Sequence, residues 1–250
     1  MPYGLYISAE GACAQSRRLE VLANNLANVD TVGFKRELAV LQARYAEATQ
    51  RGEDYPGSGS INDVGGGVHL RQTKTDFSSG PLRQTNIPTD MAIDGEGFFA
   101  VRKGDEVLLT RAGNFHINQR GELVTQQGYS VLSDAGTPVV VDLDLGPWHF
   151  LPTGTIRQAG VTQNLAIVKP ASLGDLAKAG ENLFRPLAET RPLAAGQRRV
   201  ANGCLEMSGV QPTVEMVELI ETSRAIEANV NMMQTQDQML SGLVNRLMRS

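Results

Sequence analysis

Features that mark several common protein classes are missing from this 250-residue sequence. Its first residues, MPYGLYIS, have neither the cationic start nor the continuous apolar run of a cleavable secretion signal. No later window is apolar enough to span a bilayer. We therefore expect a chain that does not span a membrane and is either soluble or exported by a route that reads no such signal.

Cysteine is scarce. Cys13 and Cys204 are the only two and stand far apart in the sequence, whereas a small secreted disulfide scaffold has several cysteines at close spacing. We interpret them as two small buried apolar residues. A bridge between them is the alternative that the sequence leaves open.

A strong charge of one sign is also lacking. The 23 cationic and 27 anionic side chains leave a net charge of -4, which supplies no long-range field for gathering phosphate polymers or anionic lipids. Nucleic acid is therefore not an expected partner.

Recognisable catalytic and metal-binding patterns are missing as well. The three histidines stand neither in an HxxxH pair nor beside a cysteine pair. Asp142 and Asp144 alternate along one predicted strand, and a solvated strand face explains them better than hard-cation binding or paired carboxylate chemistry. We predict no enzyme activity, no catalytic, metal or cofactor site, and no small-molecule substrate.

Two helical patterns stand at the ends of the chain. Residues 3 to 29 contain no proline, and Leu5, Ala12, Leu19 and Leu26 keep seven-residue spacing with Leu22 beside them, which predicts a helix with a thin apolar face. After Pro212 a much longer pattern follows, with two rows at seven-residue spacing. The first row contains Leu219, Ile226, Met233, Leu240 and Leu247. The second contains Met216, Ser223, Val230, Asp237 and Val244, in which the polar Ser223 and Asp237 interrupt the apolar seam.

Short strands are predicted between the two helices. A polar, glycine-rich stretch begins near residue 50 and indicates a flexible connection. From residue 82 to 170, turn signals such as those at Gly104, Gly121, Gly128 and Gly136 recur about every ten residues between Val, Phe, Ile, Tyr and Thr. This pattern predicts an antiparallel, all-β middle, with Trp148 and Phe150 in its core.

A single helix cannot bury its own apolar stripe. We therefore expect the two terminal helices to pair as a coiled coil, with the β domain inserted between them in the sequence. The predicted fold class is α+β, mostly β. The alternative is that both helices pack on the β domain separately. Because the N-terminal face is rich in Ala, Ser and Asn, such helices would be marginal alone and ordered by assembly.

The stretch ANNLANVDTVGFKR, residues 23–36, contains more helix-terminating and turn-forming residues than the end of a helix requires, since one glycine would be enough. Asparagine side chains bond to backbone groups where a helix stops, and glycine permits positive φ. We interpret this exit motif as a subunit-interface element that fixes the direction of the chain. Its residues are Asn24, Asn25, Asn28, Thr31, Gly33, Phe34 and Lys35.

Three separate stretches resemble one known family. NNLANVDTVGFKR, TDMAIDGEGFFAV with the following LTRAGNFHINQRGELVTQQGYSVL, and GCLEMSGVQPTVEMVELIETSRAIEANVNMMQTQDQML are similar, in this order, to the flagellar axial proteins, the rod and hook family of the bacterial flagellum. The resemblance implies four segments: an N-terminal helix (1–35), an extended linker (36–81), a central β domain (82–205) and a C-terminal helix (206–250).

The same resemblance implies a structural subunit of the basal-body rod in the periplasm. It implies export through the flagellar type III apparatus without a cleavable signal, and self-assembly with copies of itself and other rod proteins into a helical tube that transmits torque. The helical-seam residues named above would then form the subunit interface. The alternative function is a β-rich surface or glycan-binding module on a coiled-coil stalk.

Overall fold

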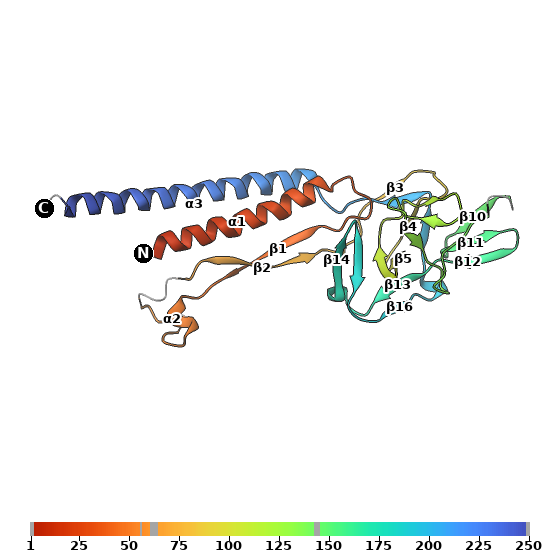
Figure 1. Ribbon diagram of the computed structural model, residues 1–250, viewed down its shortest axis with the longest axis horizontal. Helices are drawn as coiled ribbons and strands as arrows, with labels where there is room; N and C mark the ends of the chain where they lie inside the picture. Colours follow the sequence, from red (N-terminus) through yellow and green to blue (C-terminus); the bar gives the residue numbers. More distant parts are fainter. Residues whose placement is uncertain (1–2, 56, 61–64, 143–145, 249–250) are drawn as a thin grey trace. The chain divides into compact units, whose positions relative to one another are not determined.

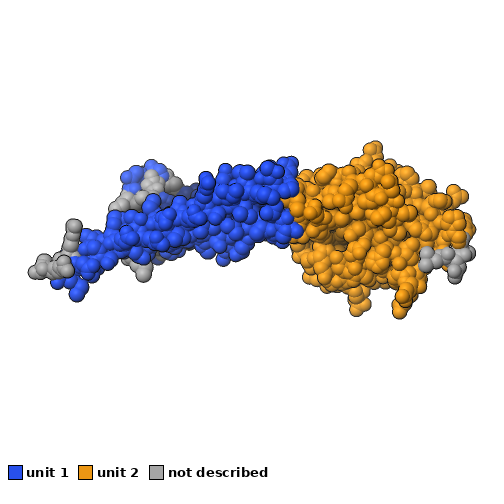
Figure 2. Space-filling model, turned by 90° about the horizontal axis from the view of Figure 1, so that it is seen from above, with its two compact units in different colours: residues 1–27, 37–76, 211–250 blue, residues 28–36, 77–210 orange. Residues whose placement is uncertain are grey.

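The computed structural model describes residues 3–55, 57–60, 65–142 and 146–248. The chain divides into two compact units, which Figure 2 distinguishes by colour. Unit 1 combines Met1–Ala27, Glu37–Asp76 and Gln211–Ser250, and unit 2 combines Asn28–Arg36 and Phe77–Val210. Unit 1 thus gathers both ends of the chain, while the short segment after the first helix belongs to unit 2.

Two antiparallel helices, α1 (Tyr3–Ala27) and α3 (Pro212–Leu247), pack along each other in unit 1 (Figure 1). Pro212 occupies the first helical position, where its fixed φ suits the helix and its missing N–H costs nothing. The predicted pairing of the terminal helices around an inserted β domain is confirmed.

A two-stranded antiparallel ribbon completes unit 1. Strands β1 (Glu37–Ala43) and β2 (Val68–Thr75) pair with each other and contact α1, and the short helix α2 (Glu47–Gln50) lies in the chain between them. An ion pair between Arg44 and Glu10 ties the end of β1 to α1. The segment that the sequence indicates as an extended linker therefore contains paired strands, which hold its two ends together along α1.

Unit 2 is built around a large antiparallel sheet with the strand order β14, β15, β6, β5, β9, β8, β7, in which β13 joins β5 to β16. Three smaller sheets pair β11 with β10 and β12, β17 with β4, and β18 with β3. This architecture confirms the predicted antiparallel β middle.

The strands of unit 2 are short. Their bounds are β3 (Leu82–Gln84), β4 (Met91–Ile93), β5 (Phe98–Lys103), β6 (Glu106–Thr110), β7 (His116–Ile117), β8 (Leu123–Val124), β9 (Ser130–Val131), β10 (Trp148–Leu151), β11 (Thr155–Gln158), β12 (Val161–Asn164), β13 (Ile167–Pro170), β14 (Leu176–Gly180), β15 (Leu183–Pro186), β16 (Thr190–Pro192), β17 (Val200–Asn202) and β18 (Cys204–Glu206). Two 3-10 turns lie at Leu173–Asp175 and Ala195–Gln197. The four glycines at the predicted turns all have positive φ.

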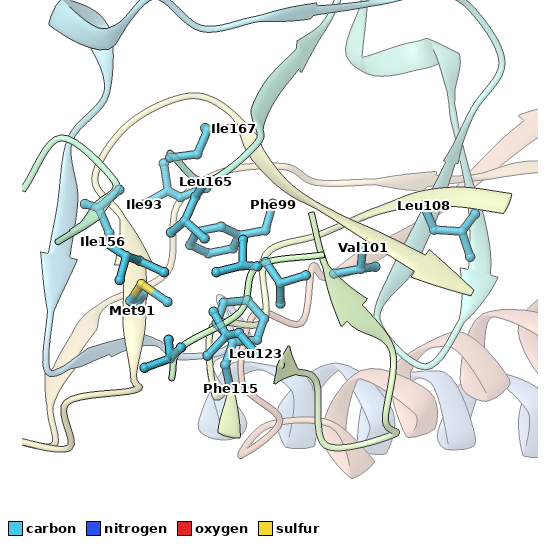
Figure 3. Packing of buried hydrophobic residues seen from close by; sticks show 14 of the residues in the cluster. Met91, Ile93, Phe99, Val101, Leu108, Phe115, Leu123, Ile156, Leu165 and Ile167 are labelled. Carbon is cyan, nitrogen blue, oxygen red and sulfur yellow. The ribbon is translucent and has the colours of Figure 1, made fainter. Parts of the chain in front are cut away.

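The main core of unit 2 lies between these strands (Figure 3). Phe99 and Phe115 meet edge to face with 5.2 Å between ring centroids, and both are almost fully buried. Trp148 and Phe150 are partly buried and pack against the same cluster, as predicted.

Cys13 differs from its prediction. It lies on the solvent side of α1 and is exposed, whereas the next residue, Ala14, is buried, and Cys204 is half-buried. Both are free thiols. Among the described residues, no helix is long and apolar enough to cross a membrane.

We predict that Phe99→Ala lowers the free energy of unfolding of unit 2 by about 3–5 kcal/mol, because it leaves a cavity in a close-packed core. Chemical denaturation measures the change. Val161→Ala, at an exposed position of β12, is the control and should stay within about 0.5 kcal/mol of the parent chain. Equal effects of the two substitutions would contradict the placement of the core.

Candidate functional site: a buried junction around Glu206

One carboxylate in unit 2 holds the segment that follows α1. Lys35 donates from Nζ to Glu206 Oε1 at 2.7 Å and to the carbonyl oxygen of Ser78 at 2.7 Å. The backbone N–H of Gly80 donates to the same carboxylate oxygen at 2.9 Å. The backbone N–H of Gly33 donates to the carbonyl oxygen of Glu206 at 2.7 Å. The Gly33–Lys35 segment is thereby fixed to strand β18.

A second cation completes the junction. Arg111 donates from Nη1 to Glu206 Oε2 at 3.2 Å and to the carbonyl oxygen of Ile93 at 3.3 Å, and from Nη2 to the carbonyl oxygen of Gly95 at 2.6 Å. Its guanidinium lies 5.1 Å from the ring centroid of Phe98. Burial lowers the pKa of Arg111, and the negative charge of Glu206 opposes that shift.

The three charged side chains are withdrawn from water, with exposed fractions of 2% for Lys35, 5% for Arg111 and 1% for Glu206. Removing ions from water is unfavourable unless each is paired and hydrogen-bonded. Here the carboxylate accepts from two cations and one backbone amide. Loss of the anion would leave two buried positive charges facing each other.

The residues of this junction stand next to the points at which the chain passes from one unit to the other. The chain passes between the two units after Ala27, Arg36, Asp76 and Val210. The residues bound to Glu206 come from the segments next to these points: Gly33 and Lys35 from the first, Ser78 and Gly80 from the second. Glu206 itself stands just before the last. One buried anion therefore holds together the parts of unit 2 that lead to unit 1.

The turn after α1 brings the chain into this junction. Thr31 donates from Oγ1 to Asn28 Oδ1 at 3.1 Å, and its backbone N–H donates to the Asn28 carbonyl oxygen at 3.2 Å. One residue after Thr31, the carbonyl oxygen of Val32 accepts a hydrogen bond from Asn182 Nδ2 at 3.0 Å. These bonds explain why polar side chains are concentrated in the exit motif.

Gly33 is required on two grounds. Its φ is +68°, a conformation that side chains with a Cβ adopt at a cost. A Cβ there would also lie 2.5 Å from the backbone nitrogen of Ala112. The backbones of the exit turn and of the strand end after β6 are thus in direct contact, which only glycine permits.

Phe34 and Lys35 are both buried, with Phe34 in contact with a cation. The Nζ of Lys178 lies 4.7 Å from the Phe34 ring centroid and donates to the Lys35 carbonyl oxygen at 3.1 Å. The sequence pattern marks Phe34 as an anchor. It contains no signal for the partners of Lys35, because Glu206 and Arg111 are distant in the chain.

The two remaining asparagines of the motif belong to unit 1. Asn25 is fully buried, accepts from the backbone N–H of Glu37 at 2.9 Å, and donates to the Glu37 carbonyl at 2.8 Å and to Glu215 Oε2 at 3.3 Å. It therefore ties α1, β1 and α3 together. Asn24, one residue earlier, is exposed.

The predicted helical-seam residues fall into two groups. Those covered at the helix pair are buried or half-buried: Leu5, Leu19, Leu22, Leu26, Leu219, Ile226 and Met233. Those left exposed are Met216, Val230, Leu240, Val244 and Leu247. The structure brings the first group together and leaves the second without cover from α1.

A polar row of α3 faces α1 where the sequence suggested Met216 and Val230. Glu215 bonds to Asn25, Asn229 lies against Gly11, and Gln236 lies against Gly4. A Cβ on Gly4 would come within 2.7 Å of Gln236 Nε2. The sequence does not reveal this row, because polar residues at seven-residue spacing give the same pattern whether they face solvent or another helix.

Metal binding finds no support in the described ranges, where no group of three His, Cys, Asp or Glu side chains comes together as a metal would require. Asp144, considered above with Asp142, lies outside the described residues.

Three family models match successive parts of the chain. Residues 5–35 match "Flagella basal body rod protein", residues 92–162 match "Flagellar hook protein FlgE/F/G D1 domain", and residues 201–247 match "Flagellar basal body rod FlgEFG protein C-terminal". The first match covers most of α1 and of the exit motif, and the last begins just before Glu206.

Curated relatives match over nearly the whole length. The flagellar basal-body rod protein FlgF of Caulobacter vibrioides is 33% identical over 248 residues, covering 99% of this chain and 98% of the relative. FlgG of Borreliella burgdorferi is 33% identical with full coverage of both chains, and FlgG of Bacillus subtilis is 32% identical with 96% and 97% covered. The chain belongs to the flagellar basal-body rod protein family.

Glu206→Gln should lower the free energy of unfolding of unit 2 by about 3–5 kcal/mol, because Lys35 and Arg111 would stay buried without their anion. The matched control is Glu106→Gln, which breaks a pair with Arg185 in which both side chains are more than half exposed. It should change stability by less than about 1 kcal/mol. Denaturant titration distinguishes the two, and a small effect at Glu206 would contradict the junction.

Gly33→Ala should destabilise unit 2 although it adds only one methyl group, because it combines strained φ with a clash against the backbone at Ala112. Gly104→Ala is the control, since Gly104 also has positive φ but has open space around it. We expect a clearly larger drop in the unfolding midpoint for Gly33→Ala. Equal drops would mean that the close approach is unimportant.

Proposed function

We propose that this chain is a structural, non-catalytic subunit of the bacterial flagellar basal-body rod. The observation that carries the proposal is similarity to proteins named flagellar basal-body rod proteins over nearly the whole length of both chains. The separate helical and β units provide what such a subunit needs, namely one part for packing with neighbours and one folded domain.

In this role the chain assembles with copies of itself and with other rod proteins into a helical tube in the periplasm. Contacts between non-identical surfaces do not close on themselves and so extend into a filament. The exposed apolar side chains of α3 are suited to such contacts, because apolar surface on a helix that faces only water is unfavourable and marks an interaction site. The tube transmits torque across the periplasm.

The junction around Glu206 is suited to a subunit that carries force along its backbone. A subunit that transmits torque must pass force along its backbone from one unit to the other. A buried, multiply bonded anchor next to the connecting segments resists local opening better than exposed loops do. Export as an unfolded chain through the flagellar type III apparatus, without a cleaved signal, completes the proposal.

The glycan-binding alternative draws no support from the described β domain. Such a module needs exposed aromatic rings in a groove. Phe98, Phe99, Phe115 and Phe184 are instead almost fully buried.

Ile226→Asp should abolish incorporation into the rod, because it places a charge in the half-buried contact between α1 and α3. Unit 2 should keep its unfolding midpoint. Immunoblots of purified basal bodies and motility in soft agar measure the effect in cells that carry the variant as their sole copy. Gln234→Asp, at an exposed position of α3, is the control and should assemble. Normal rods with Ile226→Asp would contradict the role of the helix pair.

A further inference from the structure

One extended segment of unit 2, residues 138–142 with the sequence PVVVD, lies antiparallel to the chain at β8. The backbone N–H of Val141 donates to the carbonyl oxygen of Gly121 at 2.7 Å. The carbonyl oxygen of Val139 accepts from the backbone N–H of Leu123 at 2.9 Å. One edge of this segment is therefore paired with backbone.

The opposite edge is occupied by two glutamine side chains. Because alternate residues of a strand direct their N–H and C=O groups to opposite sides, those of Val140 and Asp142 point away from β8. Gln163 donates from Nε2 to the Val140 carbonyl oxygen at 2.9 Å, and the Val140 N–H donates to Gln163 Oε1 at 3.2 Å. The Asp142 N–H donates to Gln158 Oε1 at 3.0 Å, and Gln158 Nε2 donates to the Asp142 carbonyl oxygen. Side chains thus satisfy all four groups that a neighbouring strand would otherwise pair with.

A proline stands at the next position on the same edge. Pro138 precedes Val140 by two residues, so it shares the edge of Val140 and Asp142, and it has no N–H to offer to another strand. Proline on a strand edge hinders pairing with a second chain. The edge is therefore closed at three successive positions.

The sequence of this segment explains why an open edge here would be harmful. Three consecutive valines favour the extended conformation, and short β-prone segments with an open edge pair readily with other chains. Val139 and Val141 are fully buried, but Val140 is 42% exposed. Its two hydrogen bonds to Gln163 are exposed as well. Gln163 therefore covers the one of these three positions that a second chain can reach.

We propose that Gln163, with Pro138 and Gln158 on either side, closes this strand edge and so prevents two β domains from pairing through it. A side-chain amide offers the same donor and acceptor as a peptide group, so it can take the place of a partner strand. The excluded partner is the same segment of a second copy, antiparallel, with Val140 opposite Val140 across a two-fold axis. This property goes beyond the rod function proposed above and does not depend on it.

The substitution Gln163→Ala in the full chain tests the proposal, with Val140→Cys as reporter and Cys13→Ser and Cys204→Ser as background. Residues that exchange hydrogen bonds across an antiparallel pair have Cα atoms about 5.5 Å apart, which suits a disulfide. Under a mild oxidant, non-reducing gels should show about a tenfold larger fraction of dimers than with Gln163 intact, because the edge is then open to a second copy.

Two matched controls accompany this experiment. Leu151→Cys replaces the reporter by a position on β10 that is 39% exposed, close to the 42% of Val140, and its dimer fraction should not respond to Gln163→Ala. Thr162→Ala removes the exposed side chain next to Gln163 on β12, and it should not raise the dimer fraction of the Val140→Cys chain.

Equal dimer fractions with and without Gln163 would overturn the proposal, as would an equal rise with the Leu151→Cys reporter, which would show random collision. Denaturant unfolding checks that the Gln163→Ala chain is folded. If it is not, Gln163→Asn, which is one methylene shorter and still polar, takes its place and should give the same rise. A folded variant that stays monomeric would overturn the closed edge and leave the rod function untouched.

Discussion

The buried carboxylate of Glu206 is the constraint that holds together the segments of unit 2 that follow α1 and precede α3 in the sequence. It accepts from Lys35, Arg111 and the amide of Gly80, while its own carbonyl accepts from Gly33. Because ions buried this deeply must be paired, the chain has little freedom in how it leaves α1. That path of the backbone requires a glycine at position 33 and the hydrogen-bonded turn at Asn28 and Thr31.

The helical unit is held together differently. Asn25 joins α1, β1 and α3 through hydrogen bonds, and part of the α3 surface against α1 is polar, with glycines opposite. Such contacts fix register well and contribute less apolar burial than a leucine seam. Many large apolar residues of α3 remain exposed as a result. A unit of this kind is suited to being completed by neighbouring subunits, whereas the β domain has its own close-packed core.

Periodicity was sufficient to predict the elements with regular patterns. The two terminal helices, the antiparallel middle and the turns at Gly104, Gly121, Gly128 and Gly136 were predicted from spacing alone. Long-range partners were not. Lys35 and Glu206 are 171 residues apart, and β1 and β2 pair across a polar stretch with no tight turn to announce a hairpin. The α3 row facing α1 escaped notice because its Glu, Asn and Gln residues are typical of a solvated face.

A double-mutant cycle between Lys35→Met and Glu206→Gln, read by denaturant unfolding of unit 2, tests the central claim most directly. If the buried ion pair anchors the segment after α1, the two effects must be strongly non-additive, with a coupling energy of at least about 1.5 kcal/mol. Additive effects, within about 0.5 kcal/mol, would show that the two side chains act independently and that the junction is not the anchor.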